Sequence, residues 1–435
     1  MRWSDDITYA GWGRALRATG RLARPERADG LAALVADAPA PAIGNRRSYG
    51  DAALNSGGRA VDMTRMDRIL AFDPATGEVT VEAGVTISDL AAILAPRGWL
   101  PPVMPGTGFA TIGGCIGMDV HGKNHHGAGS FGQHVTAMTL LQDGTRRRIT
   151  PRNRRLWAAT CGGLGQTGVI ETATLRLMRT RGDVMVVTER RARNWDEHLA
   201  LLDGSEATYC VGWIDATARG PDLGRGILEE GETGKGLVPR PKAPRKVPLD
   251  APPWALSGPV VRAFNRLYYA RVPASGRTVI RPIQDFFFPL DRIHDWNRLY
   301  GRRGFHQFQC VVPLDRAPAL KAMLKTIALS GLASPLAVLK RMGPGRAGDL
   351  SFPMEGYTLA VDFPARDTAA PLIGRLIAAT QEAGGRIYLA KDSLATPAQV
   401  KAMYPDWTKW ADEAAKADPD RALQTDMTRR LELRP

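Results

Sequence analysis

The stretch from Pro105 to His134 constrains the fold of this 435-residue chain more than any other segment. It reads PGTGFATIGGCIGMDVHGKNHHGAGSFGQH and holds four of the protein's seven histidines. Its apolar residues follow neither the helical nor the strand period. The glycines let the backbone approach a partner with its N–H groups facing outward, which suits a phosphate or pyrophosphate. A glycine-rich surface loop is the alternative, but the His-Gly-Lys-Asn-His-His cluster favours a binding segment.

Composition narrows the class of protein. The length indicates two or three domains, and no apolar run approaches the roughly 20 residues of a membrane span. The N-terminus carries no signal-peptide pattern, and the four cysteines are far apart, so we expect free thiols in the cytoplasm. The net charge of +14 favours an anionic partner. This anionic partner could be a phosphorylated ligand or the inner face of a membrane, contacted peripherally. The sequence has no nucleic-acid-binding motif, so we do not expect it to bind nucleic acid.

Two further glycine loops accompany the central stretch. PAPAIGNRRSYGD runs from Pro39 to Asp51, and CGGLGQTGVI runs from Cys161 to Ile170. Three such loops in a strand-rich background predict one large ligand draped over an α+β domain. Neither a strand–GxGxxG–helix fingerprint nor a P-loop is present, so we expect neither a Rossmann domain nor a P-loop NTPase.

The pattern changes after about residue 182. Strand-like runs at 184–188, 209–215, 278–288 and 307–313 alternate with helical runs at 195–202, 320–330 and 368–383. They predict a second domain built on an antiparallel sheet. Residues 229–259 are rich in Pro, Gly, Lys and Arg and predict a mobile basic loop, either a solvated linker or a contact for an acidic headgroup. Lys391 follows the apolar run 387–390, where its side chain could point into a cleft.

Several segments together resemble a known family. They occur in family order and read GNRRSYGDAALN, PGTGFATIGGCIGMDVHGKNHHGAGSFGQHV, WAATCGGLGQTGVI, QDFFFPLD, FHQFQCVVP, VDFP, YLAKDS and DMTRRLEL. The chain resembles vanillyl-alcohol-oxidase-type flavoproteins, and within them the decaprenylphosphoryl-β-D-ribose 2′-oxidase family. The resemblance implies a two-domain α+β protein with a PCMH-type FAD-binding domain at 1–182, completed by 386–435. Residues 183–385 would form the antiparallel-sheet substrate domain.

The resemblance also implies the residues that hold FAD. They are Ala42, Ile43, Gly44, Asn45, Arg46, Arg47, Ser48, Tyr49, Gly50, Asp51, Ala52, Gly106, Thr107, Thr111, Ile112, Gly113, Gly114, Met118, Asp119, Val120, His121, Ile170 and Tyr388. The histidine that attaches the flavin covalently in many relatives would fall at Arg47, so we expect non-covalent FAD.

Alcohol oxidation needs a C–H aimed at flavin N5, a proton acceptor for the hydroxyl and positive charge near the flavin. Lys391 and His121 match the catalytic positions, although a lone lysine or histidine is more often structural. The implied substrate-binding residues are Tyr49, Trp213, Phe287, Gln307, Gln309, Lys340, Thr358, Ala360 and Lys391. His125 and His126 have no carboxylate or thiol nearby to complete a metal site, so we expect none.

Three positions depart from the family pattern. Ala360 stands where the family has a pocket cysteine, Thr358 where it has an asparagine, and Arg46 where close relatives have a glycine. Reactivity toward thiol-directed inhibitors should therefore be lost. Thr358 and Ala360 also leave open which sugar the pocket takes, and Arg46 leaves the geometry of its turn open.

The resemblance implies FAD-dependent oxidation of a secondary hydroxyl of a sugar. A polyprenyl-phosphate pentose fits, and a short-chain reductase would complete its epimerisation in the synthesis of arabinan-type cell-envelope precursors. A soluble aldonolactone or alditol oxidase is the enzymatic alternative. A flavin-binding protein that has lost catalysis is the non-enzymatic one.

Overall fold

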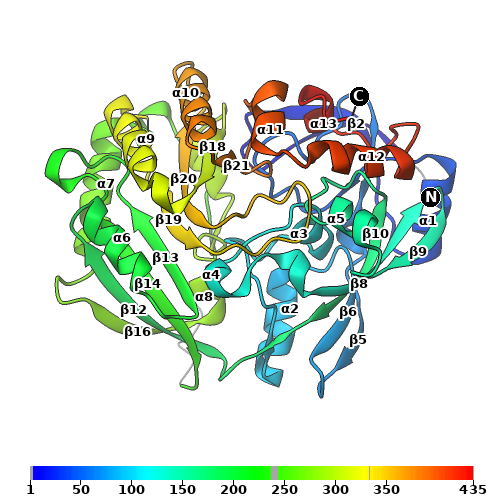
Figure 1. The fold of residues 1–435 in the computed structure, drawn as a ribbon, viewed down its shortest axis with the longest axis horizontal. Coiled ribbons are helices and arrows are strands. Elements are labelled where there is room, and N and C mark those ends of the chain that lie inside the picture. Colours follow the sequence, from blue (N-terminus) through cyan, green and yellow to red (C-terminus); the bar gives the residue numbers. More distant parts are fainter. Residues whose placement is uncertain (1–2, 237–242, 333, 435) are drawn as a thin grey trace.

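A computed structural model describes residues 3–236, 243–332 and 334–434. Two antiparallel sheets dominate it, and helices cover both, as an α+β fold requires (Figure 1). A smaller mixed sheet carries the first glycine loop. Among the described residues, no helix is long and apolar enough to cross a membrane.

The five-stranded sheet has the order β5-β6-β10-β8-β9. Its strands are β5 (Ile69–Asp73), β6 (Glu78–Glu82), β8 (Val135–Gln142), β9 (Thr145–Ile149) and β10 (Val169–Arg176). Asp143 and Gly144 join β8 to β9 and both have positive φ, at 48° and 75°. This is the geometry of a tight two-residue hairpin turn, for which Asp-Gly is a preferred pair.

The helices beside this sheet form where the sequence predicts caps. Helix α2 (Ile87–Leu94) begins after Thr86, whose hydroxyl accepts a hydrogen bond from the Asp89 N–H, and Gly98 lies beyond its end with a φ of 82°. The central glycine stretch contains the short helices α3 (Ile112–Gly117) and α4 (His125–Ala128). Cys115 and Ile116 of α3 are fully buried, so this segment contributes to the core even though its apolar period is poor.

The smaller sheet has the order β1-β2-β4-β3. Its elements are β1 (Ser4–Ala10), β2 (Arg17–Ala23), β3 (Ala42–Ile43) and β4 (Arg59–Asp62), with α1 (Ala28–Asp37) between β2 and β3. Strand β3 delivers the chain into the glycine loop that begins at Gly44. Strands β7 (Trp99–Leu100) and β11 (Met178–Arg179) form a separate antiparallel pair. Strand β11 follows directly after β10 of the five-stranded sheet.

The eight-stranded sheet has the order β16-β12-β14-β13-β19-β20-β18-β21. Its strands are β12 (Val184–Ala192), β13 (Tyr209–Ile214), β14 (Gly226–Gly234), β16 (Arg277–Pro282), β18 (Phe305–Val312), β19 (Ala337–Met342), β20 (Gly356–Pro364) and β21 (Arg386–Ile387). Helices α6 (Trp195–Asp203), α9 (Ala317–Ser330) and α10 (Ala369–Glu382) pack against it. Their leucines and isoleucines form one core with β18, β19 and β20.

Two secondary-structure predictions were wrong. The run 278–288 is not one strand, because β16 ends at Pro282 and helix α8 (Ile283–Phe287) follows. Phe286 and Phe287 are buried by tertiary packing against Tyr209, which overrides their strand propensity. Residues 229–234 belong to β14 rather than to a loop. The predicted mobility of the basic loop falls partly on 237–242, which lie outside the described residues.

Glu189 ties the edge of the eight-stranded sheet together. Its side chain on β12 is fully buried and forms ion pairs with Arg271, Arg277 and Arg281. Burial alone would raise the pKa of Glu189, but hydrogen bonds from Arg277 and Arg271 outweigh it and lower the pKa to about 2. The folded state therefore holds this carboxylate in its charged form.

Because the pKa of Glu189 is lowered, we expect the stability of this edge of the eight-stranded sheet to decrease in acid. Stability from Glu189 is present above the unfolded pKa of about 4.5 and is lost as pH falls through about 2. We expect Glu189→Gln to lower the free energy of unfolding by about 3 kcal/mol at pH 7 and by less than half of that at pH 3. Denaturant unfolding of both proteins at the two pH values measures this, and an equal loss at both would contradict it.

The C-terminal helices return to the start of the chain. They are α11 (Pro397–Met403), α12 (Trp407–Ala417) and α13 (Asp426–Arg430), and α12 packs on α5 (Arg154–Thr160). The two chain ends lie on the same side of the molecule (Figure 1). Arg430 binds Asp51 at 2.7 Å and Asp392 at 2.9 Å. One side chain thus connects the first glycine loop, the turn after β21 and the last helix.

Candidate functional site

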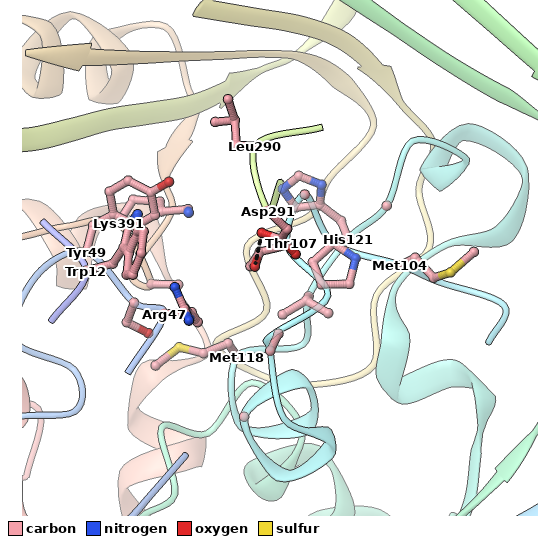
Figure 2. Close-up of a pocket in the computed structure, with 18 of the residues that line it drawn as sticks. Trp12, Arg47, Tyr49, Met104, Thr107, Met118, His121, Leu290, Asp291 and Lys391 are labelled. Carbon is pink, nitrogen blue, oxygen red and sulfur yellow. Dashed lines mark hydrogen bonds between the residues drawn. The ribbon is translucent and has the colours of Figure 1, made fainter. Parts of the chain in front are cut away.

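A single large cavity lies where the glycine loops meet the eight-stranded sheet. Its volume is about 1160 Å³, which exceeds the usual range for one drug-sized ligand. Figure 2 shows Lys391, Tyr49 and Trp12 together on one side, with His121 and Asp291 across from them. The cavity has room for a dinucleotide and a second molecule.

Most of the residues predicted to hold FAD line this cavity. They are Ala42, Ile43, Gly44, Asn45, Arg46, Arg47, Ser48, Tyr49, Ala52, Gly106, Thr107, Thr111, Gly113, Gly114, Met118, Val120, His121, Ile170 and Tyr388. At Gly44 a Cβ atom would lie 2.2 Å from the Thr111 hydroxyl oxygen. Only glycine lets these two loops approach so closely, and this close approach is what a phosphate cradle made of backbone N–H groups requires.

Four of the predicted cofactor residues do not line the cavity. Ile112 is buried in α3, and Gly50 packs on the backbone of Asp392. Asp51 binds Arg430. Asp119 accepts hydrogen bonds from the Gly132 and Ala347 N–H groups and from the Ser351 hydroxyl. These residues support the cradle from behind.

Arg47 projects into the cavity between two aromatic rings. Its guanidinium carbon lies 4.1 Å from the ring centroid of Trp12 and 4.5 Å from that of Phe109. Its buried Nε has no hydrogen-bond partner among the described residues. Burial lowers the pKa of Arg47, and nearby Asp291 opposes this. An unpartnered buried cation in this loop fits an anionic or electron-rich ligand.

The backbone at Arg46 keeps the conformation that a glycine would adopt at this position. The residue has a φ of 51°, in the left-handed region that glycine favours and other residues enter at a cost of about 1–2 kcal/mol. The loop therefore keeps a glycine-like backbone although the side chain has changed. Arg46 also lines the cavity, where it adds positive charge.

Lys391 sits in the turn that follows β21. The Tyr49 N–H donates to the Ala390 carbonyl at 2.9 Å, which joins this turn to the first glycine loop. The lysine Nζ lies 3.6 Å from the centroid of the Tyr49 ring. Burial lowers the pKa of Lys391, and the negative charge of Asp362 opposes this shift. A lysine with a lowered pKa can give up its proton and act as a base.

His121 is held from two sides. Lys340 Nζ lies 2.9 Å from its Nδ1, and Gln309 Nε2 lies 3.0 Å from its Nε2. Burial lowers the pKa of His121 well below its usual value, and the charge of Lys340 adds to this effect. Burial also lowers the pKa of Lys340 to about 7. The imidazole is therefore neutral and fixed in place.

The predicted substrate-binding residues all reach the same cavity. Besides Tyr49, Lys340 and Lys391, its lining includes Trp213, Phe287, Gln307, Gln309, Thr358 and Ala360. The Thr358 hydroxyl lies 3.3 Å from Gln309 Nε2, so it extends the network around His121. All four cysteines of the chain are buried elsewhere, and Ala360 presents only a methyl group to the ligand.

Sequence reasoning missed several cavity residues and one supporting carboxylate. The missed lining residues include Trp12, Lys123, Glu229, Tyr268, Arg271, Arg281 and Asp291. Lys123 could have been predicted from the sequence, since it belongs to the His-Gly-Lys-Asn-His-His motif. Asp362 on β20 is fully buried and accepts hydrogen bonds from Gln307 and from the Tyr300 hydroxyl. Burial raises its pKa.

The other two histidines of the central motif hold loops together. His125 Nε2 lies 2.8 Å from the Gly345 carbonyl, and His126 Nε2 lies 3.0 Å from that of Ala207. Within the described part of the chain, no three His, Cys, Asp or Glu side chains are grouped so that they could hold a metal ion.

The comparisons with known proteins agree with this geometry. A family model described as an FAD binding domain matches residues 21–150. The chain is 40% identical over 410 residues to decaprenylphosphoryl-beta-D-ribose oxidase of Mycolicibacterium smegmatis. The aligned region covers 90% of this chain and 89% of the relative. The chain belongs to this oxidase family. It is an FAD-dependent oxidoreductase that acts on CH–OH groups, with a PCMH-type fold.

The chain is also similar to other proteins, over different shares of its length. An uncharacterized protein of Streptomyces coelicolor is 34% identical over 80% of this chain and the whole of its own length. L-gulonolactone oxidase of Mus musculus is 33% identical, over 31% of this chain. The match to the lactone oxidase covers only part of the chain.

Proposed function

We propose that this oxidoreductase converts a secondary hydroxyl of a polyprenyl-phosphate pentose into a ketone. The proposal is carried by two lysines, Lys123 and Lys340, which line the cavity together with Lys391. None of the three forms an ion pair with a carboxylate among the residues that the structure describes. A phosphate on the substrate supplies the missing negative charge, whereas a neutral aldonolactone or alditol does not.

Each residue near the sugar has a distinct part in the proposed reaction. Bound FAD supplies a hydride acceptor for the carbon that carries the hydroxyl. Lys391 takes the hydroxyl proton on its neutral amine, and Tyr49 holds that amine in place. His121, held between Lys340 and Gln309, keeps these two side chains in position, and Gln309 orients the sugar through its side-chain amide. Lys340, and Lys123 beyond it, attract the phosphate.

We also propose how the chain is divided into domains. We assign residues 1–182 and 386–435 to the FAD-binding domain and 183–385 to the substrate domain. A short-chain reductase that reduces the ketone would complete an epimerisation of the pentose. The name of the Mycolicibacterium relative supports a lipid-linked ribose. We propose a cytoplasmic enzyme in contact with the inner face of the membrane, in synthesis of cell-envelope precursors.

Anaerobic bleaching of the flavin absorbance tests the substrate. We expect bleaching by a polyprenyl-phosphate ribose and little by free ribose, an alditol or an aldonolactone. Lys391→Met should slow the bleaching by about 10³-fold, while Lys325→Met, on an exposed helical surface, should leave its rate unchanged. Bleaching by free sugars or lactones alone would favour the aldonolactone or alditol oxidase. No bleaching by any sugar would favour a flavin-binding protein that has lost catalysis.

We predict that FAD is bound without a covalent bond. Arg47 occupies the attachment position, and its delocalised guanidinium stays protonated and lacks the nucleophilic nitrogen that a histidine offers. After acid precipitation the flavin should therefore appear in the supernatant. Yellow colour in the washed pellet would contradict the prediction.

A further inference from the structure

Large exposed apolar side chains gather on one part of the molecule. Seven of them lie between residues 249 and 299, namely Leu249, Trp254, Val260, Phe264, Leu267, Ile280 and Leu299. Only four others are comparably exposed in the described chain, at Ile7, Leu70, Ile93 and Leu329. A cluster of this kind marks an interaction site, whereas single exposed apolar residues need no explanation.

Three packed elements carry most of this cluster. Helix α7 (Gly258–Ala270) packs against the 3₁₀ helix η5 (Pro253–Leu256), and η5 packs against η6 (Trp296–Tyr300). Helix α7 lies at the outer edge of the molecule (Figure 1). Only Val261 and Asn265 of α7 are buried. The helix is thus attached along a narrow line, and most of its surface faces outward.

The outward surface of α7 is amphipathic. Val260, Phe264 and Leu267 follow i, i+4, i+7 spacing and share one face, with exposed fractions of 42%, 48% and 74%. Arg262 and Arg266 are exposed on other faces and form no ion pair with any described residue. The helix contains no acidic residue. One helix that presents both an exposed apolar face and unpaired arginines suits the headgroup region of an anionic lipid surface.

The same helix forms a wall of the cavity. Phe264 stacks on Tyr268 with ring centroids 5.9 Å apart, and Tyr268 packs on Trp213 at 4.6 Å. Tyr268 and Trp213 both line the cavity. Ile280 of β16 also lines it and is 48% exposed, so the cavity opens to solvent on this side. An apolar path therefore runs from the cavity to the outer face of α7.

We propose that the surface formed by α7, η5 and η6 docks on an anionic lipid bilayer and presents the cavity mouth to it. The proposal rests on the proposed function for its purpose, since a polyprenyl-phosphate sugar resides in a bilayer. Docking gives the sugar a route along the aromatic path while its tail stays in lipid. The apolar face enters the headgroup region, and Arg262 and Arg266 pair with phosphates.

Vesicle sedimentation tests the docking without any turnover. The FAD-loaded protein should sediment with vesicles of phosphatidylglycerol mixed with phosphatidylcholine, and less at 0.5 M salt or with phosphatidylcholine alone. The double variant Val260→Asp, Leu267→Asp should bind about tenfold more weakly or worse. Leu70→Asp, Ile93→Asp is the control, because it adds the same two charges at apolar residues that are exposed, at 49% and 42%, outside the docking surface. It should bind as the wild type does.

A site-specific label decides whether the apolar face enters lipid. All native cysteines are buried, so Leu267→Cys offers one accessible thiol for an environment-sensitive dye, and Leu70→Cys is its control. Vesicles should shift the emission to the blue at 267 and leave it unchanged at 70. No wild-type sedimentation, equal binding by both double variants, or binding without a shift at 267 would each overturn the proposal. The last result would indicate a purely electrostatic contact, such as with an acidic protein.

Turnover separates this proposal from the proposed function. Both double variants should keep flavin absorbance and oxidise a short-chain, water-soluble phosphoryl-sugar at the wild-type rate. If vesicle binding fails while this oxidation stands, the docking surface is wrong and the function holds. If docking stands while no phosphoryl-sugar is oxidised, the substrate assignment is wrong.

Discussion

Replacing Lys391 by methionine is expected to lower kcat/KM for the phosphoryl-sugar by about 10³-fold, with FAD still bound. Methionine keeps most of the length of the side chain and removes the base, and general acid–base catalysis is typically worth roughly 10²–10⁴-fold in rate. The lysine forms no ion pair with a carboxylate among the described residues, so its removal breaks no ion pair. The loss should therefore appear in turnover and not in folding.

The pH profile gives an independent reading of the same residue. The base must be neutral, and burial lowers the pKa of Lys391. Wild-type kcat/KM should therefore rise with pH and reach its plateau well below the usual lysine pKa of about 10.4. Stopped-flow reduction of the flavin measures this limb, which should vanish in Lys391→Met. An unchanged limb in the variant would assign the base to another group.

Replacing Arg430 by methionine is expected to lower the free energy of unfolding by about 3–5 kcal/mol and to weaken FAD retention. Arg430 pairs with Asp51 and Asp392, whose side chains are only 5% and 3% exposed. Burial alone would lower the pKa of Arg430, but the two carboxylates raise it. Without the arginine, two buried negative charges lie next to the glycine loop and next to Lys391.

The neighbouring residue provides the control for this experiment. Arg429 pairs with Asp426, and its side chain is 42% exposed, so Arg429→Met should cost no more than about 1 kcal/mol. Denaturant unfolding and the flavin-to-protein absorbance ratio after dialysis measure both variants. Replacing Asp51 and Asp392 by asparagine in the Arg430→Met background should recover part of the loss. Equal effects of the two arginine variants would contradict the assigned role of Arg430.

Local chemistry made much of the fold predictable from sequence. Asp143 and Gly144 specify a hairpin wherever two alternating strands flank them, and Thr86 specifies the start of a helix. The glycines of the central stretch indicate a close backbone approach, and the position of Lys391 after the apolar run 387–390 predicts that it faces a cleft, whose lining includes it. These signals work because each depends on residues within a few positions of one another.

Tertiary structure decided the rest, because the remaining interactions join residues far apart in the chain. Phe286 and Phe287 lie in helix α8, where Tyr209 of strand β13 packs against both of them. Pairing of β18 with β20 brings Gln309 beside Thr358 and places Asp362 under Gln307. No local sequence pattern predicts these contacts or the ion pair between Arg430 and Asp51. The sequence, through its resemblance to a known family, thus predicted a flavoenzyme and offered Lys391 as a candidate catalytic residue. Only the fold determined which charges surround that lysine, because electrostatics in a buried site depends on distances across the sheet.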